Sequence, residues 1–377
     1  MAVSAGELNR ATLARQLLLR REQVGAVEAV SRVVALQAQE PASPYVALWN
    51  RVAGFAGADL DRAFAEQEIV KAGVVRITLH AVTAEDHPAF YSAMLPYLRA
   101  SRLNDRRFTS EGLTTEAADA LVPALLDLLT EPRTKAEIEA LCGSPRMWWA
   151  LRTFAPLLHA PTGPPWSFGS RPQYVASPTP LASNLDSADV DAGRAKLVRR
   201  YLEGFGPASE ADIGAFTMLR KPPLRRALTD LGDAVVRLDG PGGVELLDVP
   251  GGAIPKATTK APPRLLGMWD EVLLAYADRS RIIPDAYRPI VIRRNGDVLA
   301  TILVDGHVAG VWRVHDDGIE VTAFHDLPAA TWRGLTDEAH QLATFLADRD
   351  TQLYRRYHHW WNDLPAGEVR VLATVRG

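Results

Sequence analysis

Residues 134–154, TKAEIEALCGSPRMWWALRTF, hold a helix–turn–helix in one uninterrupted run of sequence. Thr134 and Glu137 have the spacing of a capping box, which marks the start of a helix. A Gly-Ser-Pro turn follows at 143–145, and a further helix is expected over 146–154. This stretch decides the fold class, because the segments on either side of it extend the two helices into a larger unit.

A helix is predicted immediately before this stretch and a β-hairpin immediately after it. Residues 115–129 have the apolar spacing of a helix. Residues 157–160 and 173–175 read as strands, joined by a tip at 161–172 that is rich in proline and glycine. Three helices followed by a hairpin are typical of a winged helix.

The same order of elements occurs twice more, although the residues do not repeat at a fixed period. Residues 190–204 predict a helix, Ser209 and Asp212 have capping-box spacing, and a hairpin is expected over 234–249. Near the N-terminus, helices over 7–68 precede a β-rich run at 69–82. We therefore predict three tandem winged-helix units, with bounds 1–110, 111–180 and 185–260.

The last third of the chain has a different pattern. After a linker at 250–263, strands are predicted at 291–294, 298–304 and 307–313, and a helix at 333–348. Asn295-Gly296 and Asp305-Gly306 both have the signature of type I′ turns. Residues 264–377 are thus expected to form a C-terminal, β-hairpin-rich region, and the fold class to be mainly α with β-hairpins, α+β overall.

Composition excludes several classes of protein. The 377 residues carry 42 Lys and Arg against 45 Asp and Glu, a net charge of −3, which argues against polyanion binding by the whole surface but allows a basic groove. The single cysteine, Cys142, excludes an intramolecular disulfide and a cysteine-based zinc site. Neither a signal peptide nor a membrane span is predicted. We expect a cytoplasmic protein without metal or cofactor.

Common enzyme motifs are missing from the sequence. No phosphate-binding loop, dinucleotide fingerprint or serine-hydrolase elbow occurs. Winged helices most often bind DNA through the third helix, and they also serve as interaction modules. In the predicted third helices, the candidates for phosphate contacts are Arg146, Arg152, Arg225 and Arg226.

One short stretch, Leu36-Gln37-Ala38-Gln39-Glu40-Pro41, closes an apolar helical run that begins at Val24. Proline disfavours helical geometry in the residue before it, so the helix is expected to end near Gln39. In an extended segment, residues i and i+2 point the same way. Gln37 and Gln39 can then hold one water or polar ligand, although such pairs are also common on solvated surfaces.

The chain resembles the AlkZ-type winged-helix DNA glycosylases over roughly residues 8–365. Gln37-Ala38-Gln39 is similar to the family's Gln-apolar-Gln catalytic motif, and Gln39 matches the branch that unhooks crosslinks, since other relatives carry Asp at that position. The position of the motif matches the member that gives resistance to azinomycin B. The resemblance also rests on three later blocks, at 76–80, 278–281 and 303–313.

The resemblance implies a monofunctional DNA glycosylase acting on N7-alkylated purines in double-stranded DNA, including bulky adducts and interstrand crosslinks at guanine or adenine. Gln37 and Gln39 would position the water. Lyase activity is not expected, because no lysine lies near the motif to form a Schiff base. The alternative is a non-catalytic winged-helix DNA-binding protein, either a regulator or a protein that sequesters a drug.

Because such substrates are bulky, we expect an open, concave DNA channel lined by the winged helices. The sequence has no heptad repeat or long apolar edge, so a monomer is expected. A hairpin is expected to probe the minor groove, with Asp305 to Val308 as the first candidate and Asn295-Gly296 as the second. The expected DNA-binding residues are Arg76, His80, Arg279, Arg281, Asp305, Gly306, His307, Val308 and Arg313.

Overall fold

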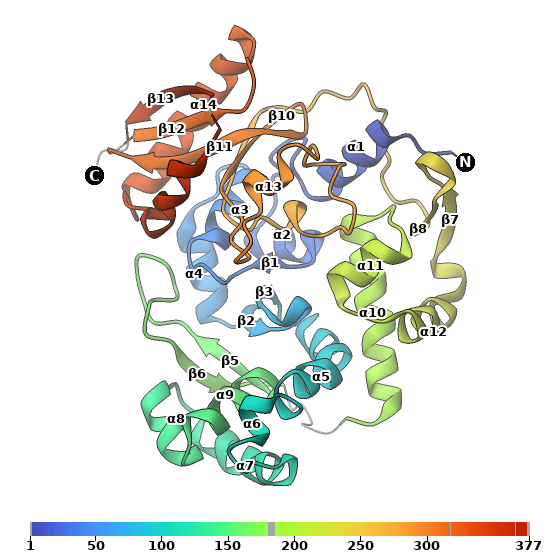
Figure 1. The fold of residues 1–377 in the computed structure, drawn as a ribbon, viewed down its shortest axis with the longest axis vertical. Coiled ribbons are helices and arrows are strands. Elements are labelled where there is room, and N and C mark those ends of the chain that lie inside the picture. Colours follow the sequence, from blue (N-terminus) through green and yellow to red (C-terminus); the bar gives the residue numbers. More distant parts are fainter. Residues whose placement is uncertain (1, 180–184, 317, 366, 375–377) are drawn as a thin grey trace.

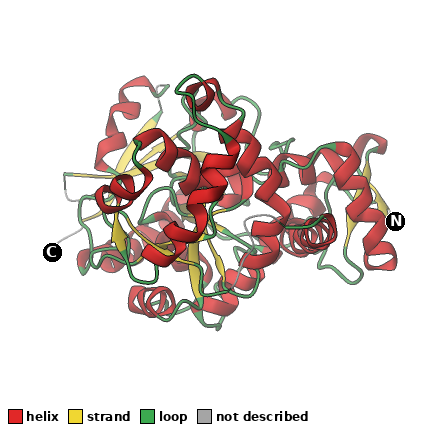
Figure 2. Ribbon diagram, turned by 90° about the horizontal axis from the view of Figure 1, so that it is seen from below, coloured by secondary structure: helices red, strands yellow, loops and turns green. Residues whose placement is uncertain are grey.

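The computed structural model describes residues 2–179, 185–316, 318–365 and 367–374. Helices and strands are mixed along the chain, and the two termini lie on opposite sides of the molecule (Figures 1 and 2). The N-terminal helices occupy the centre in Figure 1. The later segments surround them: residues of the middle third below and to the right, and the C-terminal sheet above.

The first segment contains the helices α1 to α6 and the strands β1 to β3. The Ser4 hydroxyl and the Glu7 carboxylate form a reciprocal capping box at the first helix. Asp59 lies in the first turn of α4, which begins at Gly57. The elements are α1 (Ala5–Arg15), α2 (Ala26–Val33), β1 (Leu36–Gln37), α3 (Ser43–Arg51), α4 (Gly57–Ala65), β2 (Ile69–Gly73), β3 (Leu79–Thr83), α5 (His87–Leu103) and α6 (Arg106–Thr109).

The order helix, helix, helix, hairpin is present in the second and third segments. The capping boxes expected at Thr134 and Ser209 are both confirmed. The second segment has α7 (Thr115–Leu128), β4 (Arg133–Thr134), α8 (Lys135–Cys142), α9 (Pro145–Phe154), β5 (Leu157–Ala160) and β6 (Gln173–Ala176). The third has α10 (Ser187–Phe205), α11 (Glu210–Thr217), α12 (Lys221–Leu231), β7 (Val236–Asp239) and β8 (Glu245–Asp248).

The C-terminal segment is a five-stranded antiparallel sheet with the long helix α14 packed against it. The strand predicted at 291–294 is wrong: α13 (Arg288–Val291) ends there, and only the single bridge Ile292–Val298 remains. The sheet consists of β9 (Arg264–Leu266), β10 (Thr301–Val304), β11 (His307–His315), β12 (Gly318–Ala323) and β13 (Glu368–Thr374), and the helix is α14 (Ala329–Ala347).

A six-stranded sheet crosses the predicted boundary between residues 110 and 111. Its order is β1-β3-β2-β5-β6-β4, and the two segments join where Lys71 of β2 pairs with His159 of β5. The two large apolar cores are also shared: one joins the N-terminal helices to the C-terminal sheet, and the other joins β2 and β3 to the second and third segments. Within the described ranges, no helix is long and apolar enough to cross a lipid bilayer.

Candidate functional site

The glutamine motif begins on the edge strand β1 and ends in the bend that follows it, and not at the end of a helix. Helix α2 ends at Val33, because Val34 adopts a φ of 77° and a ψ of −53°. Leu36 and Gln37 then pair with Ala81 and His80 of β3, and the N–H of Ala38 donates to the Leu79 carbonyl at 2.8 Å. The prediction of a helix reaching Gln39 is therefore wrong. The strand β3 supplies the backbone partners that hold this segment extended.

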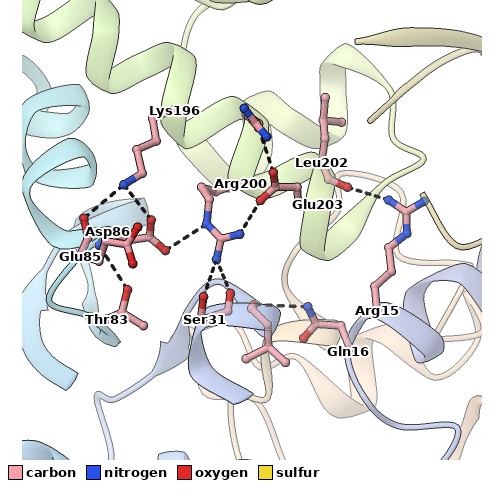
Figure 3. A network of polar contacts seen from close by, with 12 residues as sticks. Arg15, Gln16, Ser31, Thr83, Glu85, Asp86, Lys196, Arg200, Leu202 and Glu203 are labelled. Atoms are coloured by element: carbon pink, nitrogen blue, oxygen red, sulfur yellow. Dashed lines mark hydrogen bonds and ion pairs between the residues drawn. The ribbon is translucent and has the colours of Figure 1, made fainter. Parts of the chain in front are cut away.

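A polar network fixes the end of α2, just before the motif (Figure 3). Arg200 of α10 donates to the Ser31 carbonyl and forms ion pairs with Asp86 and Glu203. From the other side, the Gln16 amide donates to the carbonyls of Val33, at 3.3 Å, and Gly204, at 2.9 Å. These contacts tie the end of α2 to α10, so the segment that carries the motif starts from a fixed point.

The two glutamines have different environments. Gln37 is 7% exposed, and its Oε1 accepts the backbone N–H of Gln39 at 3.3 Å. Because Gln37 and His80 are directly opposite in the ladder, their side chains share one face of the sheet. The Gln39 side chain is exposed and lines a cavity. Gln37 thus holds the backbone of the motif, while Gln39 presents its amide to solvent.

His80, Glu271 and Arg76 form a buried cluster on the face that Gln37 shares. His80 Nε2 lies 3.0 Å from Glu271 Oε1, and Arg76 Nη2 donates to both Glu271 oxygens at 2.9 Å. Burial alone would raise the pKa of Glu271, but Arg76 and His80 outweigh it and lower that pKa to about 2. Glu271 is therefore an ionised carboxylate whose oxygens are already occupied.

Arg76 sits in a strained connection between β2 and β3. Arg76 and Ile77 both have positive φ angles, 53° and 57°, a conformation that costs about 1–2 kcal/mol for each non-glycine residue. Arg76 Nη1 is buried and has no partner within the described part of the chain. The loop therefore holds this guanidinium beside the motif with one nitrogen unused.

The predicted phosphate-binding arginines divide into engaged and free residues. Arg281 donates to the Pro207 carbonyl at 3.1 Å and stacks 4.0 Å above Tyr276, and Arg313 donates to Glu320 at 2.7 Å. Across the described residues, the side chain of Arg279 has no hydrogen bond or ion pair, and neither has that of Arg288, which was not among the predicted residues. Burial, then Arg288 and Arg76, lower the pKa of Arg279. Arg279 is thus a free cation in a positive neighbourhood.

The hairpin tip Asp305–Val308, expected first to probe DNA, is packed against α1. The Asn9 amide donates to the Gly306 carbonyl at 2.8 Å, Asp305 pairs with Arg10, and Val308 is buried. His307 lies 3.4 Å from the Asn9 amide. The turn has the expected type I′ pattern, since Asp305 and Gly306 have φ angles of 46° and 82°.

The second hairpin candidate, residues 292–298, is exposed at its tip and linked to the motif. At Asn295-Gly296 only Gly296 has a positive φ, so the type I′ prediction is wrong there. Trp269 Nε1 donates to the Gly296 carbonyl at 3.0 Å, and Trp269 packs edge-on against Tyr357. The Tyr357 hydroxyl donates to Glu40, next to Gln39, at 3.1 Å. These contacts connect the hairpin to the glutamine motif.

The cavity at Gln39 has a volume of about 400 Å³ and lies between the motif and the tip of the second segment. Sequence reasoning missed Lys71, which lines it. The prediction that no lysine lies near the motif is therefore wrong. The signal was present, because Lys71 is the only charged residue in the run IVKAGVV. The principal lining residues are Gln39, Glu40, Lys71, His159, Trp166, Phe168 and Arg356.

Comparisons with known proteins agree on one family. Residues 30–345 match the family model described as "DNA glycosylase AlkZ-like". The chain is 25% identical over 351 residues to a Streptomyces sahachiroi protein named "Interstrand DNA cross-link repair glycosylase", covering 87% of this chain and 93% of that one. The solved structure of Streptomyces sahachiroi DNA glycosylase AlkZ superposes with a TM-score of 0.77 at 23% identity, over 91% of this chain and 96% of that one.

These matches define the class of protein first: it is a DNA glycosylase, a hydrolase that acts on N-glycosyl bonds. More narrowly, the chain belongs to the AlkZ-like family, as the resemblance of its sequence implied.

Proposed function

We propose that this chain is a monofunctional DNA glycosylase that hydrolyses the N-glycosidic bond of N7-alkylated purines, including bulky adducts and interstrand crosslinks. Three observations support this: the AlkZ-like family, the name of the Streptomyces sahachiroi relative as an interstrand cross-link repair glycosylase, and the glutamine at position 39. By the same resemblance, the biological role is repair and self-resistance against an alkylating natural product of the azinomycin B type.

The observation that carries the proposal is that neither of the two carboxylates described beside the motif, Glu40 and Glu271, is free. Glu271 is held by Arg76 and His80, and Glu40 is held by Arg356 and Tyr357. A glutamine amide is not a general base at neutral pH, although its carbonyl oxygen accepts a hydrogen bond from water. Such a site orients water without strongly activating it, so it requires a substrate with a good leaving group.

An N7-alkylated guanine meets that requirement because the base is already cationic. Its departure leaves oxocarbenium character on the sugar, and a water held near C1′ completes the hydrolysis. In this scheme the exposed Gln39 amide contacts the water. Gln37 positions Gln39 through the 3.3 Å hydrogen bond to its backbone.

DNA would approach along the side that carries the exposed hairpin and the free arginines. We assign the groove-probing role to the 292–298 hairpin in place of the Asp305–Val308 tip, because the latter is packed on α1. Arg279 and Arg288 are the preferred phosphate contacts, since neither is used within the described fold. A crosslinked base is joined to both strands and cannot be flipped into a closed pocket, so the channel has to be open.

The substrate range tests this proposal. Duplexes carrying N7-methylguanine, a nitrogen-mustard-type crosslink or uracil are incubated with the protein, and abasic sites are measured. We expect product from the first two substrates and little from uracil, whose base is a poor leaving group. Strong uracil excision would reject the mechanism. Binding to all three duplexes without any product would favour the alternative, a non-catalytic DNA-binding protein.

The monofunctional assignment needs its own measurement, because Lys71 lies in the cavity. A lysine that attacks C1′ forms an imine, which borohydride reduces to a stable protein–DNA adduct. We expect no such adduct when the reaction on N7-methylguanine is run with borohydride. A trapped adduct would show that the enzyme is bifunctional.

A further inference from the structure

Lys71 is placed beside the motif by strand pairing. It lies opposite Ala81 of β3 and His159 of β5, and Ala81 in turn lies opposite Leu36, next to Gln37. Neighbouring strands are about 4.8 Å apart, which puts the Lys71 and Leu36 backbones about 10 Å from each other. By this pairing Lys71 shares a face of the sheet with Leu36 and Ala81, opposite the face of Gln37 and His80. It meets the motif beyond the end of β1, in the cavity that it lines together with Gln39.

The ammonium group of Lys71 is buried without a partner of opposite charge. Lys71 is 4% exposed, and its ammonium lies 4.5 Å from the centre of the Phe168 ring. No hydrogen bond or ion pair of this side chain is found in the part of the chain that the structure describes. A buried cation is normally paired with an anion. The unpaired ammonium of Lys71 is therefore available to an anionic ligand.

The other charged groups at the cavity do not supply the missing counter-ion. Glu40 is taken by Arg356 and by the Tyr357 hydroxyl. Burial, then Lys71 and Arg152, lower the pKa of His159 to about 3, which keeps this ring neutral. Lys71 therefore faces an engaged carboxylate, a neutral imidazole and a second cation, Arg356.

We propose that Lys71 binds a phosphate oxygen of the lesion-bearing strand, at the nucleotide that Gln39 engages. The proposal rests on the proposed function, because it takes DNA as the ligand. A phosphodiester is the anion that DNA brings to every position, and it accepts a hydrogen bond from an ammonium without covalent chemistry. The contact would set the distance between the damaged sugar and the Gln39 amide.

A scan of single phosphates tests this assignment. The probe is a duplex with one tetrahydrofuran abasic analogue, in which each phosphate near the lesion is replaced in turn by a neutral methylphosphonate. We expect the wild-type chain to lose about tenfold in affinity at one position. Lys71→Met should bind the all-phosphate duplex about tenfold more weakly than wild type does. A methylphosphonate at that one position should not weaken its binding further. Lys71→Arg should show the same dependence on methylphosphonate position as wild type.

Two comparisons separate this role from general electrostatics and from a structural role. Lys256→Met, which removes an equal charge from the exposed linker, should leave the methylphosphonate pattern unchanged. The slope of log affinity against log salt should fall by about 0.9 in Lys71→Met only, the value for one phosphate contact.

The proposal is overturned if Lys71→Met is as sensitive as wild type at every methylphosphonate, or if wild type does not bind the probe. It is also overturned if borohydride traps wild type but not Lys71→Met, since Lys71 would then be a nucleophile. Failure of the proposed function is distinguished by a separate result: wild type would then give no abasic product from N7-methylguanine. The phosphate scan measures binding alone and is read independently of that result.

Discussion

At the scale of single residues, the two motif glutamines have separate tasks. Gln37 is buried and bonded to the backbone of Gln39, whereas the Gln39 side chain is exposed. Their truncation should therefore differ in its effect on stability even where the effect on activity is the same.

We predict that Gln37→Ala lowers the free energy of unfolding by about 1 kcal/mol, the usual worth of a lost buried hydrogen bond. Gln39→Ala should change it by less than about 0.5 kcal/mol, as an exposed substitution does. Urea unfolding followed by circular dichroism measures both values. Equal destabilisation by the two variants would contradict the division of tasks.

Lys71 should cost stability, because its charge is buried without a counter-ion. Burial lowers the pKa of Lys71 from 10.5 to about 8, and Glu40 raises it only in part. In the unfolded chain Lys71 has its ordinary pKa of 10.5, so the unfolded chain binds the proton more tightly than the folded chain does. Below pH 8, the buried charge lowers the free energy of unfolding by up to about 3 kcal/mol. This loss of stability disappears as the pH rises from 8 to 10.5.

We accordingly predict that Lys71→Met is more stable than wild type at pH 7, and that the difference shrinks between pH 8 and 10. Denaturant unfolding at several pH values, with Lys256→Met as the control, measures this. Destabilisation by Lys71→Met at pH 7 would show that the lysine serves the fold and not a ligand.

At the scale of elements, local signals in the sequence predicted the helix starts, and tertiary pairing decided the motif. The capping boxes at Thr134 and Ser209 are satisfied within three residues, so the sequence contains all their partners. The end of α2 is set instead by β3, more than 40 residues away along the chain.

The hairpins show the same limit of local reasoning. The sequence marked both turns correctly as turns. It did not show that α1 covers one of them or that Trp269 links the other to the motif. Likewise, Lys71 joins Gln39 only through the pairing of three strands.

The 292–298 hairpin yields a prediction at this scale. Arg294→Ala, at its exposed tip, should slow the unhooking of a crosslinked duplex several-fold more than the excision of N7-methylguanine, because the bulky substrate depends more on groove contacts. The matched control is Arg333→Ala, an exposed arginine on α14. Rates measured in single turnover give the comparison, and equal slowing of both substrates would remove the hairpin from crosslink recognition.

At the scale of the whole molecule, the predicted domain bounds divide the sequence more sharply than the structure does. The six-stranded sheet joins residues on both sides of position 110, through the pairing of β2 with β5. The motif therefore lies on the edge of a sheet to which two segments contribute. Its position depends on both segments folding together.

We predict that β2, β3, β5 and β6 open as one cooperative unit. Hydrogen exchange under mildly destabilising conditions should give their amides one common free energy of opening. A clearly lower protection of β5 and β6 than of β2 and β3 would show that the second segment folds and opens independently.

The central claim is that Gln39 orients the hydrolytic water and that Gln37, on the edge strand β1, positions Gln39. Its most direct test is single-turnover release of N7-methylguanine from duplex DNA by wild type, Gln37→Ala, Gln39→Ala and the double variant, with Gln341→Ala, an exposed glutamine on α14, as the control. We predict losses of about 10²-fold or more for both motif variants, since misplacing a reacting group by about 1 Å has that cost. The double variant should be little worse, and the control should match wild type. Wild-type rates in the double variant would contradict the account.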